Sequence, residues 1–155
     1  MIRYCSSKAF PPYSFIHGLN VNPNKPGGYR QHLNDPVAEP INFESFFESK
    51  EYLFAIDLIN HGYYWESHVY FEAIWNAHLR VGPIANYCKA LVKIAAGAIK
   101  YEQNKKESAN RLFNGASDIF NRLPNSFFLG ITIDNLVQLT EKWKTEGQQF
   151  IDLRF

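Results

Sequence analysis

Apolar residues recur every three or four positions from residue 43 onward, which is the spacing of amphipathic α-helices. Glycines, prolines and short polar runs interrupt this pattern and divide it into five predicted helices. The predicted helices cover residues 43–60, 63–79 and 83–103, a segment that ends near residue 123, and a segment that follows residue 132. Because the connections between the first helices are short, we expect successive helices to pack as antiparallel hairpins. The predicted fold is an all-α bundle of five helices.

Residues at the predicted helix ends fit these boundaries. Asn42 is a suitable N-cap for the first helix, and Gly62 suits a left-handed residue after its last turn. Pro83 favours the first turn of the third helix, and Thr132 is predicted to cap the fifth. Further along, apolar residues alternate over 151–155, which predicts a short extended strap.

The first 41 residues have a different pattern, without a helical period. They contain six of the eight prolines in the chain, and this density favours extended and turn conformations over a helix. The apolar residues of this arm are predicted to be its anchors: Tyr13, Phe15, Ile16, Leu19, Val21 and Tyr29. We therefore expect an extended arm, residues 1–41, that packs on the bundle domain, residues 42–155, or on a partner subunit. Its two histidines, His17 and His32, are candidate contributors to a site.

The composition limits the classes of partner. Sixteen basic and fifteen acidic residues give a net charge of +1, so we expect no binding to nucleic acid or to an anionic membrane surface. No apolar stretch is long enough to span a bilayer, and the N-terminus lacks the apolar core of a signal peptide. The two cysteines, Cys5 and Cys88, do not form a disulfide framework. We therefore expect a soluble, cytoplasmic protein.

Residues 63–79 bring together more aromatic and ionisable side chains than any other helix length of the chain. An α-helix turns about 100° per residue, so one narrow face carries four of them: Trp65, His68, Glu72 and Trp75. His68 and Glu72 are four residues apart, which allows the imidazole to donate a hydrogen bond to the carboxylate. Glu66 projects about 160° away from His68, so one face cannot carry all three groups.

Three interpretations of the His68–Glu72 pair stay open. Such a pair on an aromatic face is most often a core contact, because pairing lowers the cost of burying either group. The others are a ligand or metal site with His68 and Glu72 as candidate ligands, and catalysis by these two residues with Glu66. The candidate pocket residues are Trp65, His68, Glu72, Trp75, Lys89 and Lys93. The two lysines belong to a stripe on the third helix that is either solvated or directed at one of the glutamates.

The aromatic segment resembles a known family signature. It reads Gly62-Tyr63-Tyr64-Trp65-Glu66-Ser67-His68 and then Glu72-Ala73-Ile74-Trp75. This order is similar to the pattern G-Y-Y-W-E-A-H-E-x-W-E-x-x-W of the domain of unknown function 309 family. The resemblance continues at Leu91–Gly97 and, in the arm, at Pro11–Phe15 followed by Gly18. It implies a small all-α bundle and no particular activity.

Several positions depart from that signature. Val69 stands where the family has a carboxylate, Phe71 where it has a tryptophan, and Lys89 where it has a glutamine-like residue. The histidines of the family's arm are not matched at Asn22 or Tyr29. If family members bind a metal or a substrate through those groups, this chain lacks some of the ligands.

The sequence leaves two functions open. The first is a small-ligand- or partner-binding module centred on residues 63–79, in which the arm and the aromatic face form a pocket or a homodimer contact. The alternative is a metal-dependent or acid–base, hydrolase-like enzyme that uses His68 and Glu72. This pair supplies two metal ligands where a zinc site needs at least three from the protein. The sequence therefore defines neither a metal site nor a cofactor.

Overall fold

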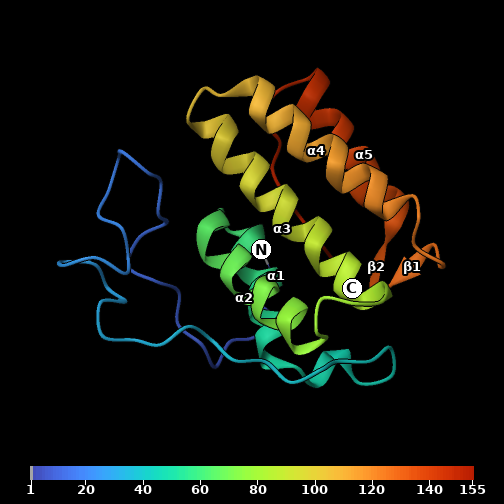
Figure 1. Cartoon of the computed structure of the whole chain (residues 1–155), viewed down its shortest axis with the longest axis horizontal. Helices are drawn as coiled ribbons and strands as arrows, with labels where there is room; N and C mark the ends of the chain where they lie inside the picture. The colour runs from blue at the N-terminus through green and yellow to red at the C-terminus, as the bar shows by residue number, and fades with distance from the viewer. Residues whose placement is uncertain (1) are drawn as a thin grey trace.

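The computed structural model describes residues 2–155, and five α-helices dominate that part of the chain from residue 50 onward (Figure 1). They are α1 (Lys50–Asn60), α2 (Tyr64–Ala77), α3 (Pro83–Glu102), α4 (Lys106–Phe120) and α5 (Ile133–Thr145). The other regular elements are a 3-10 turn, η1 (Phe46–Glu48), and two short strands, β1 (Phe127–Phe128) and β2 (Ile131–Thr132). The predicted helical class and the five helices are confirmed.

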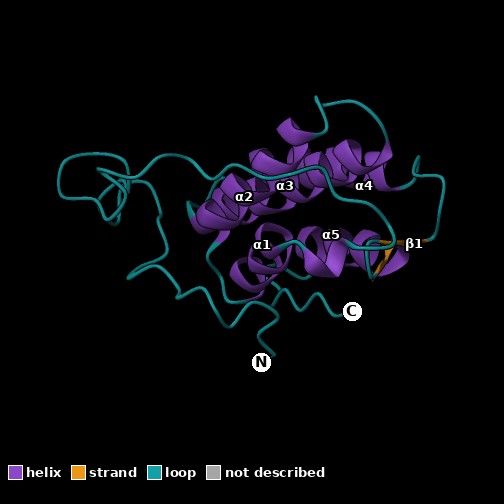
Figure 2. Cartoon of the chain, turned by 90° about the horizontal axis from the view of Figure 1, so that it is seen from below, coloured by secondary structure: helices purple, strands orange, loops and turns teal. Residues whose placement is uncertain are grey.

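Each helix packs against the next one along the chain. Figure 2 shows α2, α3 and α4 in one layer and α1 and α5 in a second. Every helix contributes a large, fully buried side chain to the core: Tyr52, Phe71, Leu91, Phe113 and Trp143. Among the described residues, no helix is both long enough and apolar enough to cross a membrane.

The first helix begins later than the sequence predicts. Residues 46–48 form the 3-10 turn, and Ser49 is in an extended conformation with ψ of 105°. The Ser49 hydroxyl accepts a hydrogen bond from the Tyr52 N–H (3.2 Å), so Ser49 is the N-cap of α1. The prediction that Asn42 caps this helix is wrong. Its Oδ1 accepts from the Ser45 N–H (2.8 Å) and closes a turn before η1.

Other boundaries agree more closely with the sequence. Pro83 lies in the first turn of α3, as predicted. Thr132 directly precedes α5, although its hydroxyl makes no capping hydrogen bond. The fourth helix ends at Phe120 rather than near residue 123.

The β1–β2 hairpin was not predicted. Its two-residue loop, Leu129–Gly130, has φ values of 45° and 84°. Positive φ at both central residues is what a type I′ turn requires. The Tyr52 hydroxyl donates to the Leu129 carbonyl (2.8 Å), so the hairpin is attached to α1.

Gly62 gives the α1–α2 connection its left-handed residue. Its φ is +80°, and a Cβ built on it meets no atom within 4 Å. We therefore expect Gly62→Ala to lower the free energy of unfolding by about 1–2 kcal/mol through backbone strain alone, measured by urea denaturation. Gly115→Ala, within α4, is the control. There the nearest atom is the flexible Lys93 Nζ at 3.3 Å, and we expect a gain of about 0.5–1 kcal/mol. Equal effects at the two glycines would contradict this account.

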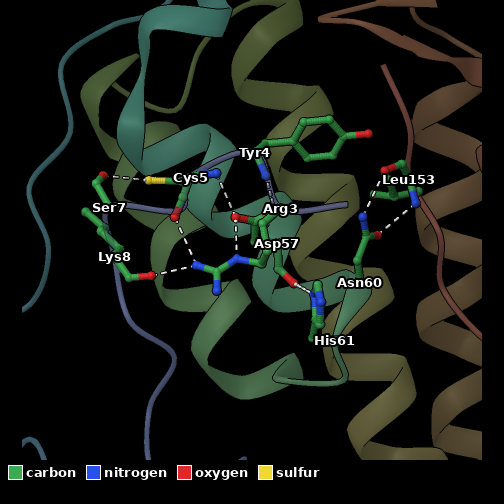
Figure 3. A network of polar contacts seen from close by, with 9 residues as sticks. All are labelled: Arg3, Tyr4, Cys5, Ser7, Lys8, Asp57, Asn60, His61 and Leu153. Carbon is green, nitrogen blue, oxygen red and sulfur yellow. Dashed lines mark hydrogen bonds and ion pairs between the residues drawn. The ribbon is translucent and has the colours of Figure 1, made fainter. Parts of the chain in front are cut away.

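The N-terminal end of the arm is bound to α1 through Asp57 (Figure 3). Asp57 is fully buried and accepts three hydrogen bonds from consecutive arm residues. The donors are Arg3 Nε (3.0 Å), Tyr4 N (2.8 Å) and Cys5 N (2.8 Å). Arg3 also donates through Nη2 to the carbonyl of Lys8 (2.6 Å), which closes the segment into a loop.

Asn60, one turn further along α1, holds the C-terminal tail (Figure 3). Its Nδ2 donates to the Leu153 carbonyl (2.8 Å), and its Oδ1 accepts from the Leu153 N–H (2.7 Å). Ile151 and Leu153 are buried while Asp152 is exposed, which agrees with the alternation seen in the sequence. The helix α1 therefore fixes both ends of the described chain.

The middle of the arm loops out from the helices (Figure 1). Phe15 is buried, but Leu19 and Val21 are 75% and 48% exposed, so their prediction as anchors is wrong. The loop satisfies its polar groups locally: Asn20 accepts from the Ile16 N–H (2.9 Å) and donates to the Ser14 carbonyl (2.7 Å). This local closure leaves the apolar residues at its tip facing solvent.

Candidate functional site

A buried carboxyl group in the first turn of α2 is the centre of the candidate site. Glu66 is only 3% exposed. Its Oε1 accepts hydrogen bonds from the Phe15 N–H (3.0 Å) and the Tyr29 hydroxyl (2.9 Å), and both donors come from the arm. Its Oε2 is buried and has no hydrogen-bond partner in the part of the chain that the structure describes. One of the two carboxyl oxygens is therefore unsatisfied.

Burial raises the pKa of Glu66. The backbone N–H of Glu66 itself, the hydrogen bonds from Phe15 and Tyr29, and the nearby charge of Arg30 lower this pKa without overcoming burial. Burial also raises the pKa of Tyr29, and the adjacent Glu66 adds to that rise, so Tyr29 stays a hydroxyl donor. The position of Glu66 near the N-terminus of α2 favours its negative form, because the helix dipole is positive there.

A cavity of about 220 Å³ lies beside this carboxyl group. The arm and the first two helices both line it, with Phe10, Tyr29, Arg30, Phe54, Glu66 and Tyr70 among the lining residues. Phe54 and Tyr70 pack edge to face with ring centroids 5.1 Å apart. The cavity therefore combines an aromatic wall with one acidic and one basic side chain.

Two cations of the arm lie against this aromatic wall. The Arg3 guanidinium is 3.9 Å from the centre of the Phe10 ring, and Lys8 Nζ is 4.8 Å from the centre of the Tyr70 ring. Lys8 also forms an ion pair with Glu51 (3.3 Å). Such cation–π contacts hold rings in place, so the wall is fixed from outside by the arm.

His68 and Glu72 each bind another partner in place of the predicted contact with one another. His68 Nδ1 hydrogen-bonds the Trp65 carbonyl, one turn back in the same helix. Glu72 Oε1 accepts from Arg80 Nη2 (3.4 Å), and its side chain is 40% exposed. Burial lowers the pKa of His68, which favours a neutral imidazole that donates from Nδ1. The structure records no hydrogen bond between His68 and Glu72.

The structure does not bring the candidate pocket residues together. Trp65 packs edge-on against Phe15 (centroids 5.5 Å apart), next to the Glu66 site. Trp75 lies at the other end of α2, with the Arg80 guanidinium 4.3 Å and Lys89 Nζ 5.9 Å from its ring centre.

Lys93 is turned toward α4, where its side chain lies against Gly115. No ion pair within residues 2–155 joins Lys89 or Lys93 to Glu66 or Glu72. Nor does that part of the chain bring three His, Cys, Asp or Glu side chains together as metal ligands.

The arm residues at Glu66 were not predicted as part of a site. His17 and His32 are the arm residues that the sequence offers as site candidates, but both are exposed, and neither lines the Glu66 cavity. Phe15, Tyr29 and Arg30 take that place. Phe15 and Tyr29 were predicted as apolar anchors, which was the available signal for their position near the bundle. No local pattern indicates which arm donor reaches which helix acceptor, because the path of an irregular segment depends on its tertiary contacts.

Residues 52–112, from α1 into α4, match the family model of a Domain of unknown function (DUF309). The predicted resemblance to the DUF309 family is confirmed over these residues. No curated protein and no solved structure matches the chain. The matched segment supplies Phe54, Glu66 and Tyr70 of the candidate site, whereas Phe15 and Tyr29 precede it. The carboxyl group thus belongs to the family region, and its hydrogen-bond donors come from the segment before it.

Proposed function

We propose that this protein binds a small organic ligand in the cavity between the arm and the first two helices, with Glu66 Oε2 as the acceptor of a ligand hydrogen bond. The observation that carries the proposal is the buried, unpartnered Oε2 beside a cavity. An unsatisfied buried polar group costs about 1–3 kcal/mol, and more when it is charged. A ligand N–H or O–H at Oε2 would recover that free energy.

The cavity limits the size and chemistry of this ligand. Its volume of about 220 Å³ is below the roughly 300–1,000 Å³ of pockets for drug-sized molecules, so a single ring or a short chain fits. Phe10, Phe54 and Tyr70 favour an apolar or aromatic body. Glu66 requires a hydrogen-bond donor. These features support a binding module centred on residues 63–79, in which Glu66 is the residue that binds the polar group of the ligand. A homodimer contact through the arm stays a prediction.

Acid–base catalysis is the second candidate function, and Glu66 is better suited to it than His68 and Glu72. Burial raises the pKa of Glu66, which is the direction of shift found in carboxyl groups that act as general acids. His68 is engaged with its own helix, and Glu72 is paired with Arg80 at the surface. A bound ligand group at Oε2 would be the proton donor or acceptor in such a reaction.

Binding of matched probes would test the proposed function. We expect benzyl alcohol to shift the amide resonances of Phe15 and of residues near Tyr29 in a saturable way. Toluene, which has the same ring without a donor, should bind about tenfold more weakly, the equivalent of one hydrogen bond. Glu66→Gln should remove this difference, because its amide oxygen accepts from Phe15 and Tyr29 and its NH2 group, which only donates, takes the place of Oε2.

Glu72→Gln is the matched control variant, because Glu72 lies on the same helix with its side chain 40% exposed. We expect it to bind both probes as the parent does. Two results would contradict the proposal. One is that neither probe shifts residues around the cavity. The other is that Glu72→Gln loses the preference for benzyl alcohol while Glu66→Gln keeps it.

A further inference from the structure

A second cavity, of about 350 Å³, lies where the arm meets the C-terminal end of α3. Residues 16–19 of the arm line one side of it, and residues 102–105 line the other. It shares no lining residue with the Glu66 cavity. The two sites can therefore be tested independently.

Two residues that line this second cavity each carry a hydrogen-bond acceptor without a partner. Glu102 Oε2 and Gln103 Oε1 are both buried, and neither has a hydrogen-bond partner among the described residues. Glu102 is also absent from the ion pairs of residues 2–155. Two adjacent residues on the wall of one cavity thus each leave an oxygen atom unsatisfied, which folded proteins rarely tolerate without a reason.

The electrostatics around Glu102 favour a cation. Burial raises the pKa of Glu102, which shows that its charged form lacks compensation from the protein. Burial also raises the pKa of Tyr64 to about 12, and the charge of Glu102 adds to this rise. Lys105 lines the cavity too, but it is exposed and forms no ion pair with Glu102.

We propose that this second cavity is a binding site for a ligand that carries a primary ammonium group. An ammonium group has three N–H donors and no acceptor, which matches the carboxylate of Glu102 and the amide oxygen of Gln103. The imidazole of His17, which lines the same cavity, offers a ring nitrogen as the third acceptor.

Other ligand classes fit this cavity less well. An anion would be repelled by the carboxylate of Glu102, and an apolar ligand would leave both oxygens unsatisfied. For a metal ion, the described residues offer no group of three His, Cys, Asp or Glu side chains. An organic cation is therefore the class that satisfies these acceptors.

The test compares two cations that differ in their N–H donors. Butylammonium chloride and tetramethylammonium chloride are titrated into the ¹⁵N-labelled full chain at constant ionic strength, and amide shifts are followed at residues 16–19 and 102–105. We expect saturable shifts with butylammonium and none with tetramethylammonium, which has the same charge without a donor. Glu102→Gln keeps the side-chain volume, and it should weaken butylammonium binding about tenfold.

Glu107→Gln is the control, because Glu107 is exposed in the first turn of α4 and does not line this cavity. It should change the butylammonium Kd by less than about twofold. Unchanged shifts at residues far from the cavity would show that both variants fold as the parent does. Equal shifts from the two cations, or an unchanged Kd in Glu102→Gln, would overturn the proposal. Either result would leave the proposal for the Glu66 cavity unaffected.

Discussion

Asp57→Ala should lower the free energy of unfolding by about 3–5 kcal/mol, because a half-buried guanidinium and two backbone N–H groups lose their shared acceptor. Asp57 is fully buried and accepts from Arg3 Nε, Tyr4 N and Cys5 N at 2.8–3.0 Å. Alanine leaves the guanidinium and two backbone N–H groups without their acceptor. Urea denaturation followed by circular dichroism measures the loss.

Two further variants identify the cause of this loss. Asp118→Ala makes the same change at an exposed position of α4, and we expect it to alter the free energy of unfolding by less than about 0.5 kcal/mol. Asp57→Asn keeps the size of the side chain but directs an amide donor toward the Arg3 guanidinium. It should therefore fall between the parent and Asp57→Ala. A loss below about 1 kcal/mol in Asp57→Ala would contradict the central role of this network.

Asp57→Ala should loosen the N-terminal end of the arm in addition to lowering the overall stability. Residues 3–5 are held to α1 by this side chain. Lys8 then lies over the ring of Tyr70, and Phe10 lines the Glu66 cavity. Amide hydrogen exchange of the first ten residues should therefore become faster in the variant than in Asp118→Ala. This links the buried aspartate to the geometry of the proposed ligand site.

The helices could be predicted from the sequence because their signal is local. Apolar spacing and end residues such as Gly62 and Pro83 act within a few positions of the element that they define. The predicted start of α1 was wrong for the same reason. Phe46 and Phe47 continue the apolar period before the helix, whereas Ser49 is the residue that caps it. The β1–β2 hairpin was missed because two-residue strands have no period to detect.

The candidate site was only partly within reach of sequence reasoning. Its aromatic helix is predicted by the apolar period, and helical geometry shows that Glu66 points away from His68. This difference in direction separates Glu66 from the face of His68 and Glu72. In the structure it places Glu66 under the arm, where Phe15 and Tyr29 bind its carboxyl group. Helical geometry gives the direction of a side chain, but it does not say which distant segment will cover it.

Glu66→Gln should make the protein more stable than the parent at and above neutral pH, by about 1–2 kcal/mol. A neutral amide keeps an oxygen that accepts from the Phe15 N–H and the Tyr29 hydroxyl. It also removes the buried, unpartnered negative charge at Oε2. Chemical denaturation of both proteins between pH 4 and pH 9 measures the difference.

The pH dependence of that difference has a defined sign. The pKa of Glu66 is raised in the folded state, so the folded protein takes up a proton at a pH where the unfolded chain is still ionised. The parent therefore gains stability relative to Glu66→Gln as the pH falls from the folded pKa toward the ordinary range of a glutamate. The gap between the two proteins should close over this window. Tyr29 and Arg30 also face the carboxyl group, but Tyr29 keeps its proton here because its pKa is raised, and arginine stays charged.

Glu107→Gln is the control for this profile, because it removes an exposed glutamate. Its stability difference from the parent should stay within about 0.5 kcal/mol across the same pH range. A Glu66→Gln protein that is less stable than the parent at pH 8, or a gap that widens as the pH falls, would contradict the assignment. If Glu66→Gln is more stable and no longer prefers benzyl alcohol to toluene, then the carboxyl group lowers the stability of the fold and is needed for ligand binding. Proteins commonly retain a destabilising polar group at a functional site because the function requires it, so replacing that group stabilises the fold and abolishes the function.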